Sequence, residues 1–182
     1  FLTIIDEEAD RLAQLIDNIL ESAKLQSQSV QLTMQPLRLD ALIRDAVIRV
    51  RTRHNNLNVE LHLESVPPIQ GDNVRLTQVL DNLFSNAVKY AAGSKIAVRV
   101  KQEDNSLLVT FSDQGPGIPK AYLPYVFERF YRVPGDRSST GSGLGLYICN
   151  QIITAHRGKI WVESELDQGT TFYIQLPIKS TL

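Results

Sequence analysis

The stretch that decides the fold of this chain is Asn82-Leu83-Phe84-Ser85-Asn86-Ala87-Val88-Lys89-Tyr90. Its polar residues recur at positions i, i+4, i+7 and i+8, so they are predicted to share one face of a helix. They are Asn82, Asn86, Lys89 and Tyr90. Apolar residues from Leu76 to Val88 supply the opposite face, which is predicted to pack on a core.

Two asparagines on one stripe need an explanation, because asparagine is a poor residue for a helix interior. An amide oxygen is a hard, neutral ligand that suits Mg²⁺, and a lysine one turn further on can meet a phosphate. The pattern therefore indicates a metal and phosphate site on this face. A solvated helix face that tolerates two asparagines is an equally open interpretation of this stretch alone.

A second stretch, Asp113-Gln114-Gly115-Pro116-Gly117, follows an apolar strand. The Asp113 carboxylate can accept a hydrogen bond from an exocyclic amine such as the adenine 6-amino group. The two glycines allow the backbone to approach a flat base closely. By itself, however, the stretch is more typical of a plain turn.

A third stretch, Gly141-Ser142-Gly143-Leu144-Gly145-Leu146, runs directly into a predicted helix. Amide groups at a helix start, together with the positive end of the helix dipole, bind phosphate oxygens. No Gly-Lys-Ser/Thr follows, and no βαβ unit precedes the glycines, which disfavours a Walker loop and a dinucleotide fold. Phosphate binding is favoured over a flexible hinge because the glycines abut a helix.

Two further stretches complete the order along the chain. Phe127-Glu128-Arg129-Phe130-Tyr131-Arg132 lies between the second and third, and is either the anchor of a lid over a ligand or a small hydrophobic cluster under a loop. Gly169-Thr170-Thr171-Phe172 comes last and is predicted to lie in a hairpin turn. The whole order is far more specific than any one stretch.

The remaining pattern predicts an α+β fold with a mixed sheet layered against helices. Residues 1 to about 27 form one helix, whose narrow apolar seam favours a bundle with a second chain over a helix on its own domain. Asp40 is the predicted N-cap of the next helix, and residues 113 to about 143 form an irregular lid. The other predicted helices cover 41–53, 72 or 73 to about 92, and 144–156. The strands cover 30–39, 57–63, 96–100, 107–112, 159–165 and 170–176, with a further short strand marked by Pro67-Pro68 and Gly71-Asp72.

Composition excludes several classes of function. Lys and Arg number 19 against 20 Asp and Glu, so no excess charge favours nucleic acid or an anionic membrane as a partner. A single cysteine, Cys149, rules out an intramolecular disulfide, and no apolar run approaches the roughly 20 residues of a membrane span. Cys149 and Trp161 are predicted to be core residues, and the three histidines to lie on the surface or at helix ends. The chain begins at Phe1 in mid-pattern, so we expect it to be a fragment of a longer protein.

The five stretches resemble, in order, the N, G1, F, G2 and G3 boxes of the catalytic domain of bacterial sensor histidine kinases. That domain belongs to the GHKL superfamily of ATP-binding domains, which includes gyrase, mismatch-repair and heat-shock chaperone ATPases. The resemblance implies a Bergerat-type two-layer α/β sandwich for residues 30–182. It also implies that residues 1–29 are the second helix of a dimerisation and histidine-phosphotransfer hairpin.

The resemblance assigns roles by position, with ATP and Mg²⁺ as the implied cofactors. It makes Asn86 the Mg²⁺ ligand and Lys89 the phosphate-binding residue, and both would act in catalysis. Asp113 would recognise adenine. The other residues implied at the nucleotide are Asn82, Tyr90, Gly115, Gly117, Ile118, Phe130, Arg132, Gly141, Gly143, Leu144, Gly145, Leu146 and Thr170.

One position separates kinases from hydrolases in the superfamily. The ATPase branches carry a glutamate one turn before the Mg²⁺ asparagine, where this chain has Asn82, which cannot act as a general base. The resemblance therefore implies a protein-histidine kinase that passes the ATP γ-phosphoryl group to a histidine. None of the three histidines has the context of the phosphoacceptor, so that histidine is expected outside this sequence. The alternatives are a nucleotide-binding module and a GHKL-type ATPase.

The resemblance also implies partners and location. A response-regulator receiver domain would accept the phosphoryl group on an aspartate, and the parent protein would form a homodimer through its helical hairpin. We expect this part to lie in the cytoplasm, with any membrane attachment made by other parts of the parent.

Overall fold

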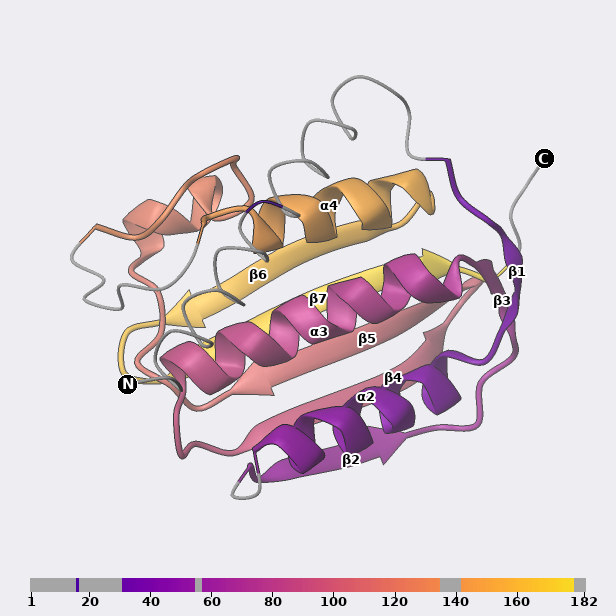
Figure 1. Ribbon diagram of the computed structural model, residues 1–182, viewed down its shortest axis with the longest axis horizontal. Coiled ribbons are helices and arrows are strands. Elements are labelled where there is room, and N and C mark those ends of the chain that lie inside the picture. The colour runs from indigo at the N-terminus through magenta and orange to yellow at the C-terminus, as the bar shows by residue number, and fades with distance from the viewer. Residues whose placement is uncertain (1–15, 17–30, 55–56, 135–141, 179–182) are drawn as a thin grey trace.

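A computed structural model describes residue 16 and residues 31–54, 57–134 and 142–178. These residues form two layers, with a five-stranded sheet behind and three α-helices across one of its faces (Figure 1). The helices are α2 (Leu39–Arg53), α3 (Asn73–Tyr90) and α4 (Gly145–Ala155), and η1 (Lys120–Tyr125) is a short 3₁₀ helix. The strands are β1 (Gln35–Leu37), β2 (Val59–Leu63), β3 (Ile69–Gly71), β4 (Ile96–Glu103), β5 (Ser106–Asp113), β6 (Lys159–Glu165) and β7 (Gly169–Pro177).

The main sheet is mixed, with the order β2-β4-β5-β7-β6. β2 runs parallel to β4, and every other neighbouring pair is antiparallel. β1 and β3 form a separate antiparallel pair. The predicted α+β class and the two-layer architecture are confirmed.

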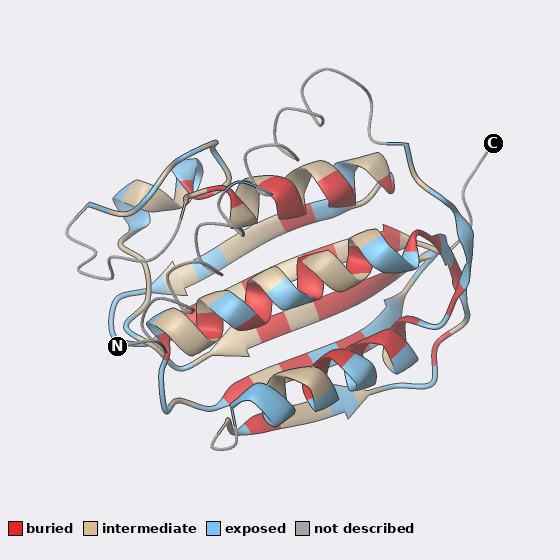
Figure 2. Cartoon of the chain, viewed as in Figure 1, coloured by how far each residue is buried: buried red, intermediate tan, exposed pale blue. Residues whose placement is uncertain are grey.

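Alternation along the strands decides which face is buried. On β5, Leu107, Val109 and Phe111 point toward the helices and are at most 2% exposed. Phe84 of α3 meets Phe111 edge to face, with ring centroids 4.9 Å apart. Buried residues follow the helix faces that lie on the sheet (Figure 2), and each such large apolar side chain contributes about 1.5–3 kcal/mol.

Two predictions on the N-terminal side are wrong. The strand expected over residues 30–39 is confined to Gln35–Leu37, because its partner β3 spans three residues. Helix α2 begins at Leu39 with Arg38 as its N-cap, so Asp40 lies in the first turn. The Asp40 carboxylate accepts a hydrogen bond from the Arg38 guanidinium at 2.9 Å and does not cap the helix. The predicted helix over residues 1–27 falls outside the described residues, apart from the helical Ile16.

A buried histidine joins the ends of α3 and α4. The N–H of Asp72, the N-cap of α3, donates to Nε2 of His156 at 2.9 Å. His156 Nδ1 lies 2.8 Å from the Ile152 carbonyl oxygen, and because Nε2 accepts, Nδ1 must carry the proton. His156 lies at a helix end, as predicted, but it is 2% exposed. The Asp72 carboxylate accepts from the N–H groups of Thr33 and Arg75, so this junction ties three segments together.

This junction predicts that the fold weakens in mild acid. Burial lowers the pKa of His156 below its ordinary value of about 6.5. The unfolded chain therefore binds a proton more readily, and stability is complete above pH 6.5 and is lost as pH falls toward the lowered pKa. We expect the free energy of unfolding to drop by up to about 1.4 kcal/mol per pH unit in that window.

Urea unfolding between pH 7 and 5 measures this effect. In His156→Gln the slope should flatten relative to the wild type. An unchanged slope in His156→Gln would assign the pH dependence to other groups.

Candidate functional site

The predicted stretches meet at one end of the sandwich, where α3 and β5 end and α4 and β7 begin (Figure 1). Asp113 and Thr170 are direct cross-strand partners. A Cβ placed on Gly115 would lie 2.7 Å from Cβ of Ala91, the residue that ends α3. The Asn82 amide reaches Gly145 at the start of α4. Residues more than 80 positions apart thus form one site.

The two asparagines of the polar stripe on α3, Asn82 and Asn86, have different contacts. Asn82 Nδ2 donates to the Gly145 carbonyl oxygen at 3.3 Å, which ties α3 to the start of α4. Among the residues that the structure describes, the half-buried Asn86 amide has no hydrogen-bond partner. Asn86 is therefore the asparagine of this stripe whose amide remains available to a ligand.

Lys89 lies one turn beyond, against its neighbour Tyr90. Its ammonium donates to the Tyr90 hydroxyl at 2.7 Å and lies 4.5 Å from the ring centroid. Within the described part of the chain, no carboxylate pairs with Lys89. A neutral tyrosine is a weak partner for a cation, so the positive charge is available to an anion such as phosphate.

A polar row closes the core face of the sheet at this end. It consists of Asp113 on β5, Thr170 on β7 and Ser164 on β6, which are successive cross-strand partners. Burial raises the pKa of Asp113, while the backbone N–H groups of Gly115 and Thr170 act in the opposite direction. The Gly115 N–H donates to Asp113 Oδ1 at 2.9 Å. Farther from this end of the sheet, the core-facing positions of the same three strands are apolar. The polar edge of a ligand can therefore bind at this row.

Ser164 was not among the residues predicted from the sequence. Its Oγ accepts from the N–H of Ile118 at 2.7 Å, which fastens the loop after Asp113 to β6. The same loop passes so close to β6 that a Cβ on Gly117 would overlap the Glu165 carbonyl group. The sequence does hold a signal for Ser164. Ile160 and Val162 alternate along the strand, so an apolar side chain is expected two residues later, where the chain has this serine.

The lid segment is pinned to the start of α4 by backbone contacts. The Phe130 N–H donates to the Gly143 carbonyl oxygen at 3.0 Å. Leu144 is fully buried, and its N–H donates to Ser142 Oγ at 3.3 Å. Leu146 packs partly buried against the core. Gly141 falls outside the described residues.

The hydrophobic-cluster interpretation of the aromatic and basic segment applies to Phe127, and the lid interpretation stays a prediction. Phe127 meets the core residue Phe172 edge to face at 6.4 Å, as a hydrophobic cluster would. Phe130 is 53% exposed with its ring 4.7 Å from the Arg129 guanidinium carbon, and Arg132 is also exposed. Phe130 thus borders the segment that leads into α4 without filling the core.

The residues present fit a magnesium ion held together with phosphates. In the described part of the chain, no three His, Cys, Asp or Glu side chains converge to form a metal site. Mg²⁺ commonly takes one or two protein oxygens and completes its shell with phosphate oxygens and water. The unpaired amide of Asn86, one turn from Lys89, matches that donor set.

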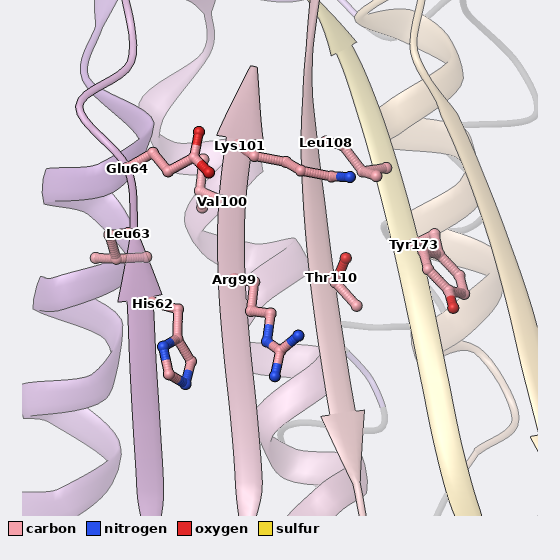
Figure 3. A pocket seen from close by; sticks show the side chains of 9 residues that line it. All are labelled: His62, Leu63, Glu64, Arg99, Val100, Lys101, Leu108, Thr110 and Tyr173. Carbon is pink, nitrogen blue, oxygen red and sulfur yellow. The ribbon is translucent and has the colours of Figure 1, made fainter. Parts of the chain in front are cut away.

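The opposite face of the sheet carries a separate hollow of about 610 Å³, lined by residues of β2, β4, β5 and β7 (Figure 3). None of the predicted site residues lines it. Trp161 lies on this face, stacked on Tyr173 with ring centroids 5.0 Å apart. The prediction that Trp161 is a core residue is therefore wrong, whereas Cys149 is fully buried as predicted.

Comparison with known proteins assigns the chain to a family. Residues 71–180 match the family described as histidine kinase-, DNA gyrase B-, and HSP90-like ATPase. The chain belongs to this family. The sensor histidine kinase WalK of Bacillus subtilis (strain 168) is 35% identical over 191 residues, which cover 98% of this chain and 30% of that protein. The chain spans about 30% of the length of the curated relatives it matches.

Solved structures agree with this family assignment. Full-length ShkA in complex with AMPPNP matches with a TM-score of 0.86 and 28% identity, over 98% of this chain and 38% of ShkA. The histidine kinase ThkA in complex with the response regulator TrrA matches with a TM-score of 0.76 and 28% identity, over 97% of this chain and 50% of ThkA. The fold is that of the histidine kinase catalytic domain. Among the described helices, none combines the length and apolar character of a membrane span.

The junction of the lid and α4 predicts a large effect of Gly143→Ala. Gly143 has φ +70°, and an added Cβ would lie 2.6 Å from the backbone carbon of Phe130. We expect a loss of roughly 2 kcal/mol or more in stability, together with weaker nucleotide binding. Gly93 is a matched control because it has φ +77° with nothing within 4 Å of the added Cβ.

Thermal unfolding and nucleotide titration of both variants measure the difference. Gly93→Ala should show the cost of positive φ alone, and Gly143→Ala should lose more stability and also lose affinity. Equal effects in the two variants would mean that the contact with Phe130 is unimportant.

Proposed function

We propose that this chain binds Mg·ATP at the end of the sandwich and passes the γ-phosphoryl group to a histidine of a separate segment. The observation that carries the proposal is the pair formed by Asn86 and Lys89 on one helix face. Among the residues that the structure describes, the Asn86 amide has no hydrogen-bond partner and the Lys89 ammonium has no carboxylate partner. Asp113 lies at the same end of the molecule with a carboxylate suited to an amino group.

Each residue then has a specific task. The Asp113 carboxylate accepts a hydrogen bond from the adenine 6-amino group, and Lys89 leaves Tyr90 to contact a phosphate. The backbone N–H groups of Gly145 and Leu146, at the start of α4, donate to phosphate oxygens. Asn86 would hold Mg²⁺, which neutralises charge on the phosphates when bound. Catalysis is then mainly positioning of the reacting groups.

Transfer to histidine is favoured over hydrolysis by the state of Asn82. Its amide is engaged with Gly145, and it offers no base that could activate water. In the proposed reaction an imidazole nitrogen bonds to the γ-phosphorus while the bond to the bridging oxygen breaks. ADP leaves, and the imidazole proton passes to solvent. His156 is buried and cannot serve as the acceptor.

The proposed partners follow from the same assignment. The phosphoryl group would move on to an aspartate of a response-regulator receiver domain, which is supported by the complex of ThkA with its regulator. Residues 1–29 would belong to a dimerisation hairpin, so the parent would be a homodimer. In this proposal the chain lies on the cytoplasmic side, and any membrane anchor belongs to other parts of the parent.

The proposal is tested by mixing the chain with a polypeptide that carries the phosphoacceptor helix and with γ-labelled ATP. Acid-labile label on the histidine of that polypeptide is the expected result, and Lys89→Ala should reduce its rate strongly. Nucleotide binding without any label on histidine would refute kinase activity. Rapid release of labelled phosphate instead would assign the chain to the hydrolases.

A further inference from the structure

Ser164 occupies the last position of the polar row, and its hydrogen-bonding capacity is fully used. Its hydroxyl donates to the Gly169 carbonyl oxygen at 2.7 Å. Its oxygen accepts from the Ile118 N–H at 2.7 Å, and the Thr170 hydroxyl oxygen lies 3.0 Å away. A serine has one donor proton and two acceptor lone pairs, so three partners saturate it.

This saturation fixes the direction of the Thr170 hydroxyl. The single proton of Ser164 is committed to Gly169, because a carbonyl oxygen has no proton to give. The contact between the two hydroxyls must then be donated by Thr170. Ser164 and Asp113 lie on opposite sides of Thr170 in the row, so the Thr170 proton points away from Asp113. Toward Asp113, Thr170 presents only lone pairs.

We infer that Ser164 is a positioning residue that determines the base specificity of the nucleotide site. The inference rests on the proposed function, since it concerns the adenine end of that site. By holding the Thr170 proton, Ser164 places a second acceptor beside the Asp113 carboxylate. Two acceptors match an amino group, which offers two N–H donors, and oppose the oxo group of a 6-oxopurine.

A second contact of Ser164 supports the same role. The Ile118 N–H bond holds the loop from Asp113 to Ile118 against β6, and the Asp167 N–H adds a bond to the Pro116 carbonyl oxygen at 2.8 Å. Without Ser164 the Ile118 amide loses its partner and the Thr170 hydroxyl can rotate. The site then offers either a donor or an acceptor to the base, and its preference for an amino group declines.

A purely structural serine would behave differently. The hydroxyls of Ser112 on β5 and Thr171 on β7 lie 2.9 Å apart, next to the Asp113–Thr170 pair and on the opposite face of the sheet. Loss of that pair affects the sheet alone. Ser112→Ala is therefore the matched control, because it removes a hydrogen-bonded serine without touching the loop.

The experiment compares calorimetric Kd values for Mg·ATP and for the Mg²⁺ complex of inosine triphosphate, which carries an oxo group in place of the 6-amino group. In Ser164→Ala we expect the preference for ATP to fall by about tenfold, as for one lost hydrogen bond. Ser164→Thr keeps a hydroxyl at this position and should retain the wild-type preference for ATP. Ser112→Ala should leave that preference unchanged. Thr170→Val removes the acceptor directly and should lower the preference even if Ser164→Ala does not fold.

Two failures are distinguishable. If the wild-type chain binds Mg·ATP but Ser164→Ala, or Thr170→Val in its place, keeps the wild-type preference within twofold, the inference about Ser164 is overturned and the proposed function stands. If the wild-type chain does not bind Mg·ATP, the proposed function fails and the inference fails with it.

Discussion

Asn86→Ala is expected to reduce Mg²⁺-dependent binding of ATP by about 100-fold or more and to abolish phosphoryl transfer, since even outer-shell partners of a metal contribute 10- to 100-fold. The half-buried amide has no hydrogen-bond partner among the described residues, so its loss removes a ligand and leaves the fold intact. Calorimetry with and without Mg²⁺ separates the metal-dependent part of the affinity.

The matched control is Asn73→Ala, which makes the same chemical change at the exposed opposite end of α3. It should retain full Mg²⁺-dependent binding. If Asn86→Ala bound Mg·ATP as tightly as the wild type, Asn86 would have no place in the metal site.

Asp113→Asn is expected to weaken ATP binding by about 10- to 100-fold, which corresponds to the 1.5–3 kcal/mol of a hydrogen bond to a charged group. The amide places an NH₂ group where one carboxylate oxygen stood, opposite either the base or one of the backbone N–H groups of Gly115 and Thr170. Competition between ATP and inosine triphosphate should show a smaller preference for ATP. Asp104→Asn, in the exposed turn at the other end of β5, is the control.

The pH dependence of binding gives a second measure of Asp113. Burial raises the pKa of this carboxyl above its usual value of about 3.9. The ionised form accepts the amino group, so affinity should be complete above the raised pKa and should decline as pH falls through it. Asp113→Asn should lack this component. An identical decline in wild type and variant would place the titrating group elsewhere.

Much of the fold was predictable because helix and strand periods are strong in this sequence. The stripe from Asn82 to Tyr90 lies on α3, and the polar turn residues mark the ends of β5 and β7 as expected. The errors arise where a particular side-chain contact or the facing of a strand outweighs the general pattern. Asp40 resembles an N-cap, but its carboxylate is bound by the Arg38 side chain. Trp161 has a core-type side chain, yet its strand position turns it to the open face.

The site was predictable as a set of stretches, but its internal contacts were not. The sequence indicates that Asn82 and Asn86 share a face, and it does not distinguish the asparagine tied to Gly145 from the one without a partner. The role of Ser164 was not predictable because it depends on contacts with Ile118 and Thr170. Ile118 is 46 positions away in the chain, so the contact requires the strand register.

The central claim is that an amide, an ammonium group and a carboxylate at one end of the sandwich bind the two ends of one nucleotide. Isothermal titration of the chain with Mg·AMPPNP tests it most directly. The account predicts saturable binding with one nucleotide per chain, lost in Asn86→Ala and raising the melting temperature of the wild type. No heat of binding and an unshifted melting temperature at saturating nucleotide would contradict it.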